Sequence, residues 1–183
     1  MKKKPILKKQ MNRQYYYLFG LSVMLMLLAF VIESPQSLVS GMMTILVSPS
    51  QLFTDYMEIA SVGSTLLNVA IMLGISIYSY KKLEIPLNGT VIGSLGMLAG
   101  FSFFGKNLFN SIPFMIGVWI YTKVTKQNYR NYVIVGLFGS ALGPLISFLA
   151  FSGVLPQGWS VLIAYALGIF IGFILPQLST QFL

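Results

Sequence analysis

Lys106 is the residue in this sequence best placed to do chemistry, because it carries a charge between two apolar segments. An ionisable side chain at membrane depth is costly unless it meets a partner or water, and by default it marks a functional site. Asn107 and Asn110 follow it with further hydrogen-bond donors and acceptors. Such a cluster suits attraction of an anion or a polar solute, and the alternative is a lysine that snorkels to the interface.

Three further residues complete a candidate solute pathway with that cluster: Asp55, Asn68 and Phe104. Asp55 is expected either to cap a helix or to contact a solute, and Lys106 could pair with it or with Glu58. Asn68 lies near the middle of an apolar run, where an amide either bonds a neighbouring helix or lines a polar path. Phe104 either packs or forms a narrow apolar constriction with its aromatic neighbours Phe101, Phe103 and Phe109.

The residue types present exclude several kinds of chemistry. The chain contains no Cys and no His, which excludes thiolate and imidazole metal sites and histidine acid–base catalysis. The sequence contains no phosphate-binding glycine loop and no nucleophile elbow. We therefore expect no enzyme activity, no cofactor and no metal. The net charge of +8 does not indicate nucleic-acid binding, because the basic residues flank apolar spans.

The elements that position these residues are expected to be membrane-spanning helices. Only 9% of the residues are charged, against about 25% in soluble domains. A bilayer span needs about 20 apolar residues, and several runs approach that length. We predict an all-α, polytopic bundle of about six spanning helices, at residues 15–32, 59–80, 86–104, 108–122, 132–151 and 159–175. Residues 38–47 are too short to span and are predicted to be re-entrant or interfacial.

One transmembrane domain, residues 15–178, is expected to follow a basic cytoplasmic tail at residues 1–14, with residues 179–183 as the C-terminal end. The segment 108–122 has a helical length of only about 22 Å. The turn at Lys106 is therefore expected to sink below the membrane surface, or both flanking segments form a re-entrant hairpin. Gly-x-x-x-Gly spacings predict close helix approach at Gly89/Gly93, Gly96/Gly100, Gly139/Gly143 and Gly168/Gly172. Pro144 predicts a kink, and Pro176 the end of the last helix.

The charge distribution predicts the orientation of the chain. With both termini cytoplasmic, eleven of the twelve Lys and Arg residues lie inside, and Lys106 alone lies towards the outer side. The opposite orientation would place eleven basic residues outside. We therefore predict a multi-pass protein of a cell membrane.

Three stretches resemble signature segments of a bacterial family of polytopic membrane proteins that is known only as a domain of unknown function. They are Ser48-Pro-Ser-Gln-Leu-Phe-Thr-Asp-Tyr56, Gly100-Phe-Ser-Phe-Phe-Gly-Lys-Asn107 and Phe138-Gly-Ser-Ala-Leu-Gly-Pro144. The resemblance implies a location in the bacterial cytoplasmic membrane, and it implies no catalytic residues. It implies a longer protein, with a second half that carries a Gly-Tyr-Asn-Leu-Tyr-Asn-like motif absent from this sequence. More loosely, the layout is similar to one repeat of urea-transporter-like channels.

The expected function is half of a channel or transporter for a small polar solute or anion. The pathway would be completed by a second half or by other copies in a homo-oligomer. One alternative is a substrate-binding membrane subunit that docks on an energising module, which would require a stripe of small residues on the first helix. Another is a membrane scaffold without transport. The lipid bilayer is the expected environment, and the solute is not identified by the sequence.

Overall fold

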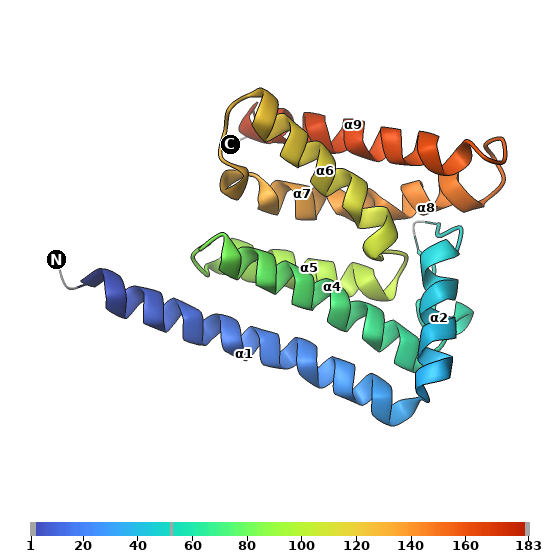
Figure 1. The fold of residues 1–183 in the computed structure, drawn as a ribbon, viewed down its shortest axis with the longest axis horizontal. Helices are drawn as coiled ribbons and strands as arrows, with labels where there is room; N and C mark the ends of the chain where they lie inside the picture. The colour runs from blue at the N-terminus through green and yellow to red at the C-terminus, as the bar shows by residue number, and fades with distance from the viewer. Residues whose placement is uncertain (1–2, 52, 182–183) are drawn as a thin grey trace.

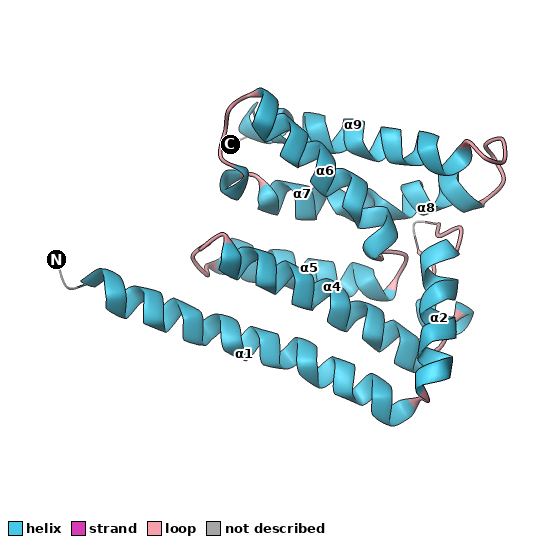
Figure 2. Ribbon diagram, in the orientation of Figure 1, coloured by secondary structure: helices cyan, strands magenta, loops and turns pink. Residues whose placement is uncertain are grey.

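The computed structural model describes residues 3–51 and 53–181, and these residues form helices joined by turns and loops (Figure 2). One group of helices consists of α1 (Lys3–Ile32), α4 (Val62–Lys82) and α5 (Gly89–Phe103). A second group consists of α6 (Leu108–Val124), α7 (Val133–Gly139), α8 (Gly143–Phe151) and α9 (Ser160–Gln181). Figure 1 shows α2 (Pro35–Val47) across one end of the molecule, and α1 begins and α9 ends at the opposite end.

Within residues 3–51 and 53–181, four helical stretches are long and apolar enough to cross a membrane: Arg13–Ile32, Val62–Lys82, Val133–Phe151 and Ser160–Ser179. This finding supports a multi-pass membrane protein with fewer full-length spans than the six predicted. The helices α5 and α6 have 15 and 17 residues, because asparagine caps start them at Gly89 and Leu108. At 1.5 Å per residue their lengths are about 22 Å and 26 Å, short of the hydrocarbon thickness of about 30 Å.

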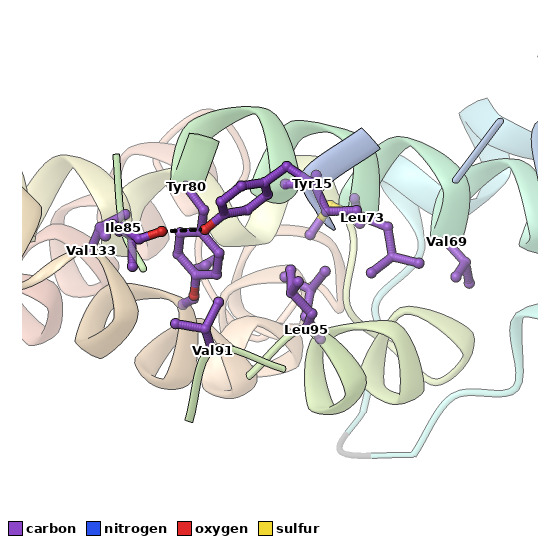
Figure 3. Close-up of a cluster of buried hydrophobic side chains, with 12 residues drawn as sticks. Tyr15, Val69, Leu73, Tyr80, Ile85, Val91, Leu95 and Val133 are labelled. Carbon is purple, nitrogen blue, oxygen red and sulfur yellow. Dashed lines mark hydrogen bonds between the residues drawn. The ribbon is translucent and has the colours of Figure 1, made fainter. Parts of the chain in front are cut away.

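The first helix packs along α4, and the basic segment before Arg13 already belongs to it, since α1 begins at Lys3. Ser22 lies against Gly74 and donates a hydrogen bond to the carbonyl of Ala70 at 2.7 Å. Towards the other end, the Tyr15 hydroxyl donates to the carbonyl of Ile85 at 2.8 Å (Figure 3). Tyr15 belongs to an apolar core whose members come mainly from α4 and α5.

The short segment predicted at residues 38–47 is a helix that begins earlier, at Pro35. Ser34 caps it and Pro35 occupies its first turn, where the missing N–H of proline does no harm. The helix crosses α4 at Gly41, which lies directly against Ser64. Beside this crossing, the Glu33 carboxylate accepts from Ser61 Oγ at 2.8 Å and from Gly63 N at 2.9 Å. An acidic group is favourable there because a helix N-terminus carries partial positive charge.

The glycine spacings predict close helix approach correctly in one helix and wrongly in another. In α9, an added Cβ at Gly172 would collide with the backbone of Phe114, and one at Gly168 would lie 2.8 Å from Pro113 Cβ, so α6 and α9 are in close contact. In α5 the prediction is wrong. Added Cβ atoms meet nothing within 4 Å at any of its four glycines, which lie on an exposed face of the helix: Gly89, Gly93, Gly96 and Gly100.

Of the two prolines predicted to disturb helices, Pro144 lies next to a helix break as expected and Pro176 does not end its helix. The expected kink is a three-residue 3-10 segment, η2 (Ser140–Leu142), between α7 and α8, and Pro144 lies in the first turn of α8. Pro176 does not end the last helix, because α9 continues to Gln181 with this proline inside it. Membrane helices tolerate interior proline where neighbouring groups satisfy the freed carbonyls.

Candidate functional site

The turn that carries Lys106 is shaped by Gly105. Helix α5 ends at Phe103, Gly105 adopts a φ of +90°, and α6 starts immediately after Asn107. A side chain at Gly105 would be strained by this backbone conformation, and its Cβ would lie 3.1 Å from the Gln51 carbonyl oxygen. The Lys106 N–H donates to the Phe101 carbonyl at 3.0 Å and closes the turn. The glycine therefore directs the lysine side chain inward.

The side chain of Lys106 is completely buried, with 0% of its surface exposed. Its Nζ donates to the Leu137 carbonyl at 3.2 Å and to Ser140 Oγ at 2.5 Å. Both acceptors are uncharged. The lysine therefore does not snorkel to an interface, and its hydrogen bonds are with the α7–η2 break instead of the predicted partners Asp55 and Glu58.

The two asparagines after Lys106 start α6 by capping each other. Asn107 Oδ1 accepts from the Asn110 N–H at 3.1 Å, and Asn110 Oδ1 accepts from the Asn107 N–H at 3.0 Å. Asn107 Nδ2 also donates to the Ile45 carbonyl and to the Tyr56 hydroxyl, both at 2.9 Å. Such reciprocal caps satisfy two N–H groups that a helix start leaves without partners. The pair fixes α6 against α2 and α3 (Tyr56–Ile59).

Asn110 extends the network to α8 and Asn68 extends it to α4. Asn110 Nδ2 donates to the Gly105 carbonyl at 2.8 Å and to Ser147 Oγ at 2.9 Å. Asn68 Nδ2 donates to the carbonyls of Ser102 at 2.8 Å and Lys106 at 2.9 Å. We call this connected, buried set the polar node; its side chains are Ser50, Tyr56, Asn68, Lys106, Asn107, Asn110, Ser140 and Ser147.

Two predicted pathway residues lie outside the polar node. Asp55 is exposed and caps α3, with Oδ1 accepting from the Met57 N–H at 2.8 Å. The Phe104 side chain is 43% exposed, and its backbone forms an isolated antiparallel bridge with Asp55. The expected aromatic constriction is also not assembled here, because Phe109 packs instead against Phe151 and Tyr165, with ring centroids 5.0 Å apart in each pair.

Sequence reasoning missed four members of the polar node: Ser50, Tyr56, Ser140 and Ser147. The Tyr56 hydroxyl accepts from Asn107 and lies 3.2 Å from Ser50 Oγ. A signal for three of them was present in the sequence. Ser50 and Tyr56 lie in the stretch 48–56 and Ser140 lies in 138–144, and both stretches meet the third, 100–107, in the polar node.

A second feature of α6 is a groove on the side facing α4 and the loop after α6. Its most enclosed part has a volume of about 230 Å³ and lies between α4, α6 and α7. A second hollow of about 300 Å³ shares Ile112, Met115 and Tyr129 with the first. A third, of about 530 Å³, shares Trp119 and Tyr129 with the second and includes Lys123 and Lys126. We call these three adjoining hollows, which share lining residues, the α6 groove.

Two hydroxyl groups along the α6 groove have unusual surroundings. Ser111 Oγ lines the most enclosed hollow. Among the buried side-chain oxygen and nitrogen atoms of the described residues, it is the only one without a hydrogen-bond partner. Tyr129, in the 3-10 segment η1 (Tyr129–Asn131), borders all three hollows. Burial raises the pKa of the Tyr129 phenol. Both hydroxyls are thus neutral groups in poorly solvated positions.

The long apolar helices and the buried polar node define an α-helical protein of the multi-pass membrane class. The model of the family DUF1576, described as "Protein of unknown function", matches residues 34–183, and the chain belongs to this family. No curated protein and no solved structure matches the chain. The family assignment agrees with the resemblance of the three signature stretches, and it brings no activity with it.

Proposed function

We propose that this protein is a module of a channel or transporter for a small polar solute or anion, with the polar node at its centre. One observation carries the proposal: the Lys106 side chain is fully buried and its two acceptors are neutral. An ammonium group donates three hydrogen bonds, so the protonated form of this side chain retains attraction for an anionic or strongly dipolar partner.

The position of the polar node supports this proposal. Lys106 lies where α5 ends and α6 begins, and it contacts the break between α7 and α8. Transporters place discontinuous helices at their binding sites, where helix ends offer unpaired polar groups to a solute. Within the proposal, α5 and α6 are two further short crossings, and their connecting turn is sunk into the outer leaflet of a bacterial cytoplasmic membrane. The chain would then cross six times, with both termini cytoplasmic.

Access to Lys106 requires movement or an additional element, because the side chain is closed off within the chain. We therefore include in the proposal a pathway completed by a second copy or by a further protein segment, and we propose transport without catalysis. The oligomeric state in mild detergent, measured by light scattering, distinguishes a homo-oligomer from a single chain.

A thermal-shift screen in detergent tests the proposal with a panel of inorganic anions and small polar solutes. A solute at 100 times its Kd is expected to raise the unfolding temperature by about 5–10 °C. Lys106→Met should abolish the rise, whereas Lys106→Arg keeps a cation and should retain part of it. Lys82→Met, which removes an exposed lysine at the end of α4, is the matched control and should leave the shift unchanged.

Two results would overturn the proposal. One is a complete lack of stabilisation by any solute in the wild-type protein. The other is a shift that survives in Lys106→Met, which would remove the polar node from the site. For any solute that gives a shift, uptake into proteoliposomes then separates transport from binding alone.

A further inference from the structure

We propose that the α6 groove binds one anionic phospholipid, with an acyl chain along the groove and the phosphate at Lys123 and Lys126. The inference is independent of the proposed transport function. It rests on a different face of α6 from the polar node. Its occupant is set by two features of the groove, an apolar interior and a basic mouth.

The interior of the groove follows one face of α6. Leu108, Ile112, Met115 and Trp119 recur at intervals of three or four residues, so they form a continuous stripe along the helix. The helical rise from residue 108 to residue 123 is about 22 Å, more than one leaflet of a hydrocarbon core about 30 Å thick. The groove is therefore long enough for an acyl chain that lies along the helix.

Hydrocarbon is the occupant expected for such a groove. Ile112 is 37% exposed and Trp119 is 50% exposed, so the second hollow opens to the surroundings of the helix bundle. Apolar surface at this depth in a bilayer has lipid tails as its neighbours, because water is absent from the hydrocarbon core. A hollow left empty would forfeit dispersion contacts along its whole lining.

The mouth of the groove is basic. Lys123 and Lys126 are both exposed there, beside Gln127 and Asn128, and no acidic residue borders any of the three hollows. The Lys123 ammonium lies over the Trp119 ring, 5.6 Å from its centroid. Basic pockets between membrane helices on the cytoplasmic side suit anionic head groups, and the predicted orientation places this mouth on that side.

The helix end at the mouth does not repel an anion strongly. Carbonyl groups at a helix C-terminus carry partial negative charge, which opposes anion binding when they are free. Here the carbonyls of Tyr121, Thr122 and Lys123 accept backbone N–H groups from the turn that follows, at 2.9–3.4 Å. The two lysines therefore dominate the charge that a phosphate group would meet.

Native mass spectrometry after gentle delipidation tests the proposal with added phosphatidylglycerol, with phosphatidylcholine of the same chains, and with glycerophosphate alone. One phosphatidylglycerol should be retained in preference to phosphatidylcholine. Lys123→Gln/Lys126→Gln should weaken its binding by about 30-fold. The matched control is Lys81→Gln/Lys82→Gln, which removes the same charge at the end of α4 and should have little effect.

A second variant tests the apolar part of the groove. Ser111→Leu projects a larger side chain into the most enclosed hollow and should reduce phospholipid retention, whereas Ser111→Ala should not. Unfolding temperatures of both variants show whether the fold is intact. Equal retention of the two phospholipids, or equal loss in the two lysine pairs, would overturn the proposal. So would unchanged retention in a folded Ser111→Leu protein, or retention of glycerophosphate equal to that of the lipid.

Discussion

The polar node and the α6 groove are built by the same helix, and they differ in how completely their polar groups are used. In the polar node, the amides of Asn68, Asn107 and Asn110 each donate both of their N–H groups. In the groove, the neighbouring Ser111 hydroxyl is buried without a partner. Two adjacent residues of α6 therefore differ: the side-chain N–H groups of Asn110 are both hydrogen-bonded, and the hydroxyl of Ser111 is not.

This difference separates two roles that polar residues have at membrane depth. An amide whose donors are all satisfied holds helices together, and its removal leaves several buried groups without partners. An apolar hollow with few polar groups has room for a ligand but little to hold it in one orientation. The polar node therefore determines how the helices meet, and the groove offers space. Lys106 is intermediate, because it is buried and hydrogen-bonded but has no charged partner among its acceptors.

The largest effect is expected from Asn110→Ala, which breaks the polar node. The substitution removes the bonds to the Gly105 carbonyl, to Ser147 Oγ and from the Asn107 N–H. Each buried group left without a partner costs about 1–3 kcal/mol, so the free energy of unfolding should fall by at least about 3 kcal/mol. Unfolding by SDS titration in mixed micelles measures the change, with exposed Asn131→Ala as the control. A loss below about 1 kcal/mol would mean that the network is not important for stability.

A smaller effect is expected when the polar node is crowded without any loss of a polar group. In Gly143→Ala, the new Cβ would lie 2.5 Å from Asn110 Oδ1, so the amide must move out of its capping position. Overpacking of this kind typically costs about 1–3 kcal/mol. Gly96→Ala is the control, because nothing lies within 4 Å of its added Cβ, and better helix propensity should make it neutral or stabilising by up to about 1 kcal/mol. Equal destabilisation by both changes, in the same SDS titration, would contradict the comparison.

The sequence predicts the residues of the polar node better than their contacts. Lys106, Asn107, Asn110 and Asn68 stand out because polar groups are rare in apolar segments, and the structure brings all four together. The partners of Lys106 were not predictable from charge, because Ser140 and the Leu137 carbonyl are neutral and more than 30 positions away. The sequence predicts Asp55 and Lys106 on the same side of the membrane. Two residues on the same side of a membrane need not be in contact.

The helices show a similar limit of sequence reasoning. The predicted span 59–80 is observed at Val62–Lys82, because apolar length and flanking lysines are local features. The same glycine spacing brings α9 into close contact with α6 and leaves a face of α5 exposed, because the spacing permits close approach but does not supply a partner helix. The α6 groove had no sequence signal, since it depends on how α4, α6 and α7 diverge in space.

The smallest effect on stability is expected from Ser111→Ala. The sign of this effect tests the description of the α6 groove. Removing a buried hydroxyl that has no partner relieves an unfavourable desolvation and breaks no hydrogen bond of that hydroxyl. The free energy of unfolding should therefore change by less than about 0.5 kcal/mol, or rise slightly. A loss of 1 kcal/mol or more in the SDS titration would show that Ser111 has a partner in the membrane. Such a partner would have to enter through the α6 groove, and added phosphatidylglycerol would then increase the difference between wild type and variant. A near-zero change in the free energy of unfolding for Ser111→Ala, together with a large loss for Asn110→Ala, would show that these neighbouring residues have different roles. Asn110 would stabilise the polar node, and Ser111 would only line the α6 groove.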